Sequence, residues 1–145
     1  MTTPATLTGK CLCETVRFEL TAPCRAVIVC HCGQCARWTG YAVAATAVGV
    51  DHFRFLAGSD AVQWYRASDQ AERGFCRICG SSLFWKPGDG TRISVLAGTL
   101  AGLTGLTIGA HIHVAEKPDF TEIAAGPPQY PGGSIGALEL PRAGS

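Results

Sequence analysis

The five residues CRICG, Cys76 to Gly80, place two cysteines three positions apart and follow them with a glycine. This spacing is typical of a zinc knuckle, in which a tight turn aims two thiolates at one ion and the glycine lets backbone amides approach the sulfurs. One knuckle supplies two ligands, whereas a structural zinc needs four in a tetrahedron at about 2.3 Å. The natural complement is CLC near the start of the chain. We therefore predict a closed structural zinc site formed by Cys11, Cys13, Cys76 and Cys79, which ties the first strand to the middle of the chain.

The chain has 145 residues, enough to bury a core and too few for two independent domains. It has a net charge of +1 and no basic run, which argues against a nucleic-acid partner. The start, MTTPATLTGK, has no basic segment followed by an apolar run, and no segment approaches the roughly 18 apolar residues that a membrane span requires. We therefore expect a single cytoplasmic domain without a membrane segment.

The eight cysteines are more consistent with metal sites than with disulfides. A core of this size is stable without disulfides, and cysteines two positions apart on a strand have poor geometry for a disulfide. The alternative is that Cys11, Cys13, Cys76 and Cys79 are unrelated buried cysteines that act as small apolar residues.

Short apolar or alternating runs between the 18 glycines indicate an all-β fold. The stretches expected to form strands are ETVRFEL, RAVIVC, YAVAATAV, FRFL, VQWYR, SLFW, RISVL and LTIGAHIHV. One turn of helix is expected at residues 34–39. We predict a single zinc-binding β domain over residues 1–130 and a surface arm, rich in proline and glycine, over residues 131–145.

The stretch CHCGQC, residues 30–35, carries a second group of cysteines. Cys30, Cys32 and Cys35 are close enough in sequence for one loop to present three thiolates to one metal. Three protein ligands with an open fourth position are the arrangement of a catalytic zinc, whereas four ligands would make another closed site. The fourth position is therefore the question that this stretch raises.

Other cysteine and histidine residues are the candidates for that position. A strand through RAVIV moves the chain by roughly 15–20 Å, which places Cys24 outside the site; the alternative is that a bend brings it in and makes both zincs structural. His31 is expected to point away from the metal, toward the surroundings of the site or the surface. His111 and His113 share a strand face, where we expect them to pack beside the core or to line a pocket, and His52 is expected at the surface.

Taken together, these motifs resemble the glutathione-dependent formaldehyde-activating enzyme family, which also includes centromere protein V. The matching stretches, within residues 9–130, are GKCLCETVRF, CHCGQCARWTG, FCRICGSSLFW, VLAGTL and HIHVAEKPDFTEIAAGPPQY. The resemblance implies an all-β, Mss4-like β-tent with two zinc-binding cysteine clusters. It implies a structural zinc on the four paired cysteines, and a second zinc completed by an external thiol such as glutathione on Cys30, Cys32 and Cys35.

The chemistry of three thiolates on Zn²⁺ suits a thiol better than water, because a site with a net charge near −1 is a weak Lewis acid for making hydroxide. A thiol that enters the open position would lose its proton and could add to an aldehyde. The resemblance thus implies a carbon-sulfur lyase that acts on an adduct such as S-hydroxymethylglutathione, with Cys30, Cys32 and Cys35 as catalytic residues. Arg37 and Trp38 adjoin the knuckle and are candidates to contact the thiol cofactor; otherwise they have ordinary roles at the rim and in the core.

The contrasting hypothesis is a non-catalytic zinc module, or a carrier of thiol adducts, with a protein-binding role. Thiols add to formaldehyde without help, so thiol binding alone does not establish catalysis. The partners that we expect are a small thiol and an aldehyde or their adduct, and apolar runs such as YAVAATAV permit a homodimer without requiring one.

Overall fold

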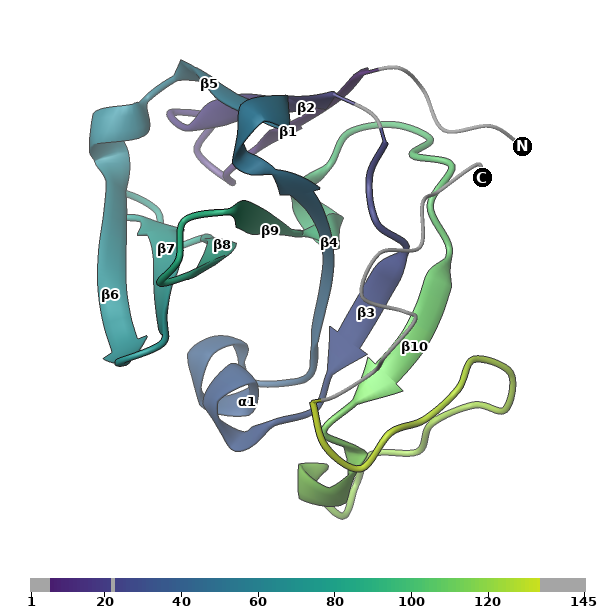
Figure 1. Cartoon of the computed structure of the whole chain (residues 1–145). Coiled ribbons are helices and arrows are strands. Elements are labelled where there is room, and N and C mark those ends of the chain that lie inside the picture. Colours follow the sequence, from purple (N-terminus) through teal and green to yellow (C-terminus); the bar gives the residue numbers. More distant parts are fainter. Residues whose placement is uncertain (1–5, 22, 134–145) are drawn as a thin grey trace.

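The protein is described by a computed structural model that covers residues 6–21 and 23–133 (Figure 1). Within these residues, ten strands and one short α-helix make up the main regular structure. The strands are β1 (Thr6–Lys10), β2 (Arg17–Thr21), β3 (Val27–Cys30), β4 (Val43–Gly49), β5 (Phe53–Ala57), β6 (Val62–Ser68), β7 (Ala71–Cys76), β8 (Ser82–Pro87), β9 (Arg92–Leu96) and β10 (Ile108–Ile112). The helix is α1 (Gly33–Thr39), and single 3₁₀ turns lie at Val50–His52, Ser59–Ala61, Ala97–Thr99 and Val114–Glu116. The all-β prediction is confirmed.

The strands form two sheets. The smaller has the order β1-β2-β5 and the larger has the order β10-β3-β4-β9-β8-β7-β6. The pairing of β10 with β3 is parallel, and the neighbours in the rest of both sheets are antiparallel. In Figure 1 the β1-β2-β5 sheet lies above the larger sheet, which curves around from β6 to β10. Helix α1 follows β3 and lies at the bottom of the view, at the side of the larger sheet away from the smaller one.

The main core lies between the two sheets and is centred on aromatic rings. Phe18 of β2 and Phe84 of β8 are both fully buried, and their ring centroids are 5.0 Å apart. Phe53 of β5 packs edge-on against Phe84 at 5.3 Å. Burial of each such ring contributes about 1.5–3 kcal/mol, so this cluster is a large part of what holds the sheets together.

Alternation along β9 gives the larger sheet two different faces. Ile93 and Val95 point into the main core, whereas Arg92, Ser94 and Leu96 line a cavity on the other side. The same sheet therefore builds both the core and the wall of the candidate site.

Each of the eight stretches that we expected to form strands overlaps a strand of the structure, and the turn of helix expected at residues 34–39 covers all of α1 except its first residue. Strands β1 and β7 were not predicted. Of the predicted arm, residues 134–145 lie outside the described part of the chain, as do residues 1–5. None of the helices in the described part is long and apolar enough to cross a membrane.

Candidate metal centres and active-site cavity

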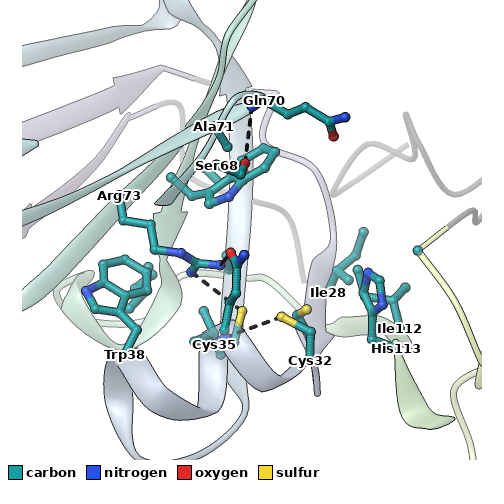
Figure 2. Close-up of a pocket in the computed structure, with 18 of the residues that line it drawn as sticks. Ile28, Cys32, Cys35, Trp38, Ser68, Gln70, Ala71, Arg73, Ile112 and His113 are labelled. Atoms are coloured by element: carbon teal, nitrogen blue, oxygen red, sulfur yellow. Dashed lines mark hydrogen bonds between the residues drawn. The ribbon is translucent and has the colours of Figure 1, made fainter. Parts of the chain in front are cut away.

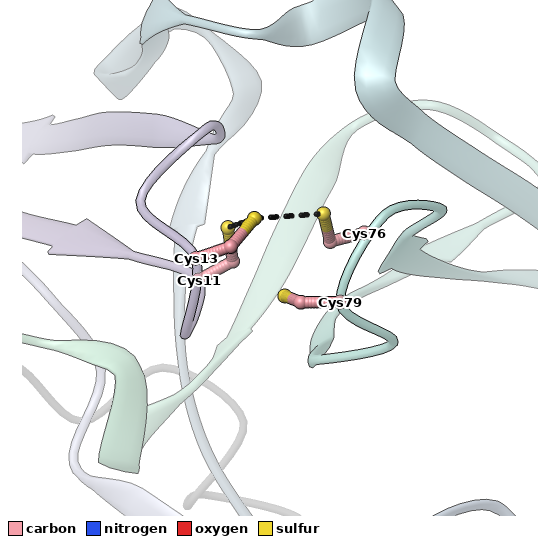
Figure 3. A group of neighbouring side chains, drawn as sticks. All are labelled: Cys11, Cys13, Cys76 and Cys79. Carbon is pink, nitrogen blue, oxygen red and sulfur yellow. Dashed lines mark hydrogen bonds between the residues drawn. The ribbon is translucent and has the colours of Figure 1, made fainter.

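The first cysteine cluster joins the loop after β1 to the last residue of β7 and the turn that follows it (Figure 3). The four Sγ atoms of Cys11, Cys13, Cys76 and Cys79 lie within 4.8 Å of one another. The Cys11–Cys13 sulfur separation is 3.6 Å and the Cys13–Cys76 separation is 3.9 Å. Four sulfurs at about 2.3 Å from one ion would be about 3.8 Å apart at the edges of a tetrahedron, so the donor set fits zinc.

Backbone groups shape this cluster as the sequence motif requires. Gly80 adopts a left-handed φ of 80° and donates its N–H to the Cys76 carbonyl at 2.8 Å, which closes the knuckle. The amide of Val16 donates to Cys11 Sγ at 3.3 Å. The two loops are also joined directly, since the Leu12 amide donates to Ser81 Oγ at 2.9 Å.

The thiols of this cluster differ in how easily they ionise. Burial raises the pKa of Cys11 to about 11, while a hydrogen bond with the Ser81 side chain lowers the pKa of Cys79 to about 5. Not all four thiols therefore ionise on their own. A bound metal ion would supply the positive charge that stabilises all four as thiolates.

The second cluster forms where β3 runs into α1. Cys30 ends β3, Cys32 is the N-cap of α1, and Cys35 is buried in its first turn. Their three Sγ atoms also lie within 4.8 Å of one another, and the Cys35 amide donates to Cys32 Sγ at 3.3 Å. Among the described residues, no fourth cysteine, histidine or carboxylate joins this group.

The three thiols lie so close together that their pKa values shift in opposite directions. Hydrogen bonds from Cys30 and then Cys35 lower the pKa of Cys32, because they stabilise its thiolate. The same contacts raise the pKa of Cys30. One thiolate therefore forms readily, and full ionisation of the three needs a cation among them, so this donor set also fits a metal that prefers sulfur.

Cys24 lies apart from both clusters. Its side chain is fully buried in the main core, next to the apolar side chains between the sheets. Burial raises the pKa of this thiol, as expected for a cysteine that serves as a small apolar residue. The geometry contradicts the alternative in which Cys24 closes the second site.

A cavity of about 810 Å³ opens over the second cluster. Its floor includes Cys30, Cys32 and Cys35, and α1 adds Gln34 and Trp38 (Figure 2). Its walls come largely from alternate residues of the larger sheet. These include Val43 and Ala45 of β4, Ala71 and Arg73 of β7, Trp85 of β8, and Arg92, Ser94 and Leu96 of β9.

Among the residues that sequence reasoning missed at this site, Arg73 contacts a thiol of the cluster directly. It is buried, and its Nη1 group lies 3.7 Å from Cys35 Sγ while Nη2 donates to Gln34 Oε1 at 3.2 Å. Its guanidinium also lies over the Trp38 ring at 4.9 Å from the centroid. Figure 2 shows the side chain reaching between Trp38 and Cys35. Alternation places Arg73 on the same strand face as Ala71, but this signal could be used only if β7 were recognised as a strand.

Of the two residues predicted to contact the thiol cofactor, only Trp38 faces the cavity. Trp38 lines the cavity, whereas Arg37 is exposed, is not part of the lining, and donates to the Gly33 carbonyl at 3.4 Å. The cation that contacts a thiol of this cluster is thus Arg73, whereas Arg37 contacts only the knuckle backbone. The reason is helical geometry, since neighbouring helix residues point in directions about 100° apart.

Two of the four histidines pair with each other, and His113 pairs with a glutamate. His31 is buried, and its Nε2 lies 3.0 Å from Nδ1 of His111. His113 follows the end of β10 at a left-handed φ of 55°, lines the cavity, and pairs through Nδ1 with Glu116 Oε2 at 3.0 Å. The other oxygen of Glu116 accepts the Gly33 amide of the knuckle at 3.1 Å. His52 is exposed, as expected, and contacts Thr21.

Comparison with known proteins agrees with this architecture. Residues 6–116 match the family model described as "Glutathione-dependent formaldehyde-activating enzyme". An uncharacterized lyase of Schizosaccharomyces pombe is 26% identical over 117 residues, which are 80% of this chain and 84% of that protein. A crystal structure of a Rhodobacter sphaeroides protein, 23% identical, has a similar fold with a TM-score of 0.55 over 66% of this chain and 89% of that one. The chain therefore belongs to the glutathione-dependent formaldehyde-activating enzyme family.

Proposed function

We propose that this protein is a carbon-sulfur lyase that forms or cleaves the adduct between a small thiol, glutathione or a similar compound, and an aldehyde such as formaldehyde. Family membership and the relative named as a lyase support an enzyme of this type. The observation that carries the proposal is the second cluster. Three thiols converge on the floor of a cavity, and no fourth protein ligand from the described residues completes the set.

The two clusters would hold two zinc ions in different roles. Cys11, Cys13, Cys76 and Cys79 would hold a closed structural ion, and Cys30, Cys32 and Cys35 would hold the second with one position left for a ligand. When bound there, zinc supplies a cationic centre that lowers the pKa of an incoming thiol.

The surrounding residues would orient the reactants and handle the proton. Trp38 presents a ring face to the cavity, and Arg73 places its charge beside the thiolate of Cys35. With Nδ1 donating to Glu116, Nε2 of His113 would accept the proton of the incoming thiol, since it has no hydrogen-bond partner among the residues that the structure describes. As the sulfur bonds to the aldehyde carbon and the C=O π bond opens, His113 returns that proton to the oxygen. Cleavage of the adduct is the reverse sequence.

The test is the rate of adduct exchange between glutathione and formaldehyde, measured by NMR exchange spectroscopy above the rate without enzyme. We expect the zinc-loaded protein to accelerate exchange and Cys30→Ser to return it to the uncatalysed rate. Cys24→Ala is the matched control, since it also removes a thiol, but one that lies outside the cluster, and it should keep the activity.

The proposal fails if the wild-type protein gives no acceleration while both metals are bound. It also fails if Cys30→Ser remains as active as Cys24→Ala. In either case the non-catalytic zinc module becomes the better hypothesis.

A further inference from the structure

The thiols of the second cluster lie in a small apolar cluster that is separate from the main core. The residues that pack with Cys30, Cys32 and Cys35 there are Val43, Ala45, Trp38 and Leu96. Trp38 and Leu96 are only half-buried, and both line the cavity. Apolar surface therefore faces the cavity directly beside the thiols.

The strand register brings aliphatic side chains to both sides of Cys30. In β4 the residue opposite Cys30 is Val43, and in β10 it is Ile112. Neighbouring strands are about 4.8 Å apart, so these two residues are the nearest sheet neighbours of the Cys30 thiol. Ile112 is half-buried and lines the cavity, as Val43 also does.

The next row of the sheet continues the same surface. Ile28 lies two residues before Cys30 and so points to the same face. Its partner in β4 is Ala45, and the partner of Ala45 in β9 is Leu96. Figure 2 shows Ile28 together with Ile112 on one side of the thiols. The five side chains of the two rows form what we call the aliphatic patch: Ile28, Val43, Ala45, Leu96 and Ile112.

The charged side chains of the cavity come from other positions. Arg25 precedes β3, Arg73 is in β7, Arg92 begins β9 and Glu116 follows β10. Arg25 reaches the second row, where its Nη2 donates to the Ala45 carbonyl at 3.0 Å. Of the residues that the structure describes in the two rows, those that line the cavity are aliphatic apart from Cys30 itself. This part of the cavity therefore favours an apolar group.

The proposed reaction places a carbon substituent at this point. In an adduct RCH(OH)SR′, the sulfur is bonded to the carbon that came from the aldehyde, and R is the next group along. On cleavage the electron pair of the C–S bond goes to sulfur, the hydroxyl group loses its proton as C=O forms, and that proton ends on the released thiol. R takes no part in the bond changes, but it stays beside the thiols throughout.

The size of the cavity also leaves room for a larger R group. Its volume of about 810 Å³ is toward the upper end of the range for cavities that hold drug-sized ligands. With formaldehyde R is a hydrogen atom, which would leave the aliphatic patch uncovered. The two rows of the patch are about 7 Å apart along the strands, roughly the length of an extended chain of six carbons.

We propose that the aliphatic patch binds the alkyl group of the aldehyde, so that adducts of apolar aldehydes with roughly six carbons are preferred over the formaldehyde adduct, because each buried methylene adds about fourfold to the affinity. The inference rests on the proposed function in one respect, since it places the sulfur of the adduct at the three-cysteine cluster. It names the class of aldehyde that this site selects.

Stable thioethers test the patch without turnover. The zinc-loaded protein is titrated by calorimetry with S-methylglutathione and with S-hexylglutathione, which share the peptide and differ only in the length of the alkyl chain on sulfur. We expect the hexyl compound to bind at least about thirtyfold more tightly, because most of its five additional methylenes are buried.

Variants then locate the preference for the longer chain. Ile112→Thr and Leu96→Gln should each reduce it by at least about threefold, because each replaces apolar surface of the patch by a polar group. Ile108→Thr is the matched control for the first, since Ile108 is in the same strand but is 47% exposed and outside the cavity lining. Leu103→Gln is the control for the second, since Leu103 is 82% exposed and also outside the lining. Both controls should keep the wild-type preference.

The inference is overturned if neither thioether binds the wild-type protein, if the two bind equally well, or if the folded patch variants keep the preference of their controls. Should one patch variant fail to fold, the other and its control decide. A preference for the hexyl compound that depends on the patch, in a protein that accelerates exchange of neither formaldehyde nor hexanal with glutathione, would refute the proposed function and leave the patch as a binding site. Accelerated exchange with equal binding of the two thioethers would refute the patch alone.

Discussion

At the scale of single residues, Arg73 is the side chain that most directly links the sheet to the second cysteine cluster. It is a buried cation whose nearest charged neighbours would be the thiolates of the knuckle, and it has no carboxylate partner among the described residues. Its charge offsets that of the thiolates, while its hydrogen bond to Gln34 fixes the first turn of α1.

Replacement of this arginine by an apolar residue of similar length should weaken the second metal site alone. We expect Arg73→Met to lower zinc affinity at Cys30, Cys32 and Cys35 by about 10–100-fold, the range seen when residues that support metal ligands are changed. Chelator competition would measure this as earlier release of one zinc per chain. The four-cysteine site is the internal control, and simultaneous release of both ions at the wild-type chelator concentration would contradict the expectation.

The residues of the two clusters could be grouped from sequence, whereas Arg73 could not. Cysteine spacings of two and three positions are local signals that survive without a structure. Arg73 is 38 positions from Cys35, and only the curvature of the larger sheet brings them together. Arg37 lies outside the cavity for a local reason, because it points about 100° away from its helix neighbour Trp38.

At the scale of elements, β7 shows why one strand escaped prediction. Its sequence AERGFC has a buried arginine and a central glycine where a strand pattern expects apolar or β-branched residues. The glycine has a packing reason, because a Cβ at Gly74 would lie 2.8 Å from the ring of Trp64 on the neighbouring strand. Strand β1, TLTGK, is similarly weak in pattern, and its glycine leaves room for the ring of Phe18.

A methyl group at position 74 should therefore push the Trp64 ring away from the β6–β7 pair. We expect Gly74→Ala to lower the free energy of unfolding by about 1–3 kcal/mol, as overpacking of a fitted site does. Gly98→Ala is the matched control, because a Cβ there meets nothing within 4 Å, and it should change stability little. Urea unfolding of the zinc-saturated proteins measures both, and equal stability of the two variants would show that the ring shifts without cost.

At the scale of the whole molecule, one cysteine cluster connects the two sheets and the other lies at the cavity. The four-cysteine cluster joins the smaller sheet to the larger one, since Cys13 follows β1 and Cys76 ends β7, 63 residues further along the chain. The three-cysteine cluster lies on the opposite face of the larger sheet, at the floor of the cavity. The CxC and CxxC spacings predicted the first connection correctly, since thiols that share an ion must meet. They contain no information on the cavity, which depends on the curvature of seven paired strands.

The central claim is that a visiting thiol completes the second cluster. Cobalt(II) substituted for zinc reports on it, because absorption bands from sulfur to cobalt change when a sulfur ligand is added. We predict that glutathione changes the spectrum of one of two bound cobalt ions, that Cys30→Ser abolishes the change, and that Cys24→Ala retains it. A spectrum that does not respond to glutathione, or a response that is lost in Cys24→Ala, would contradict the open three-thiolate site.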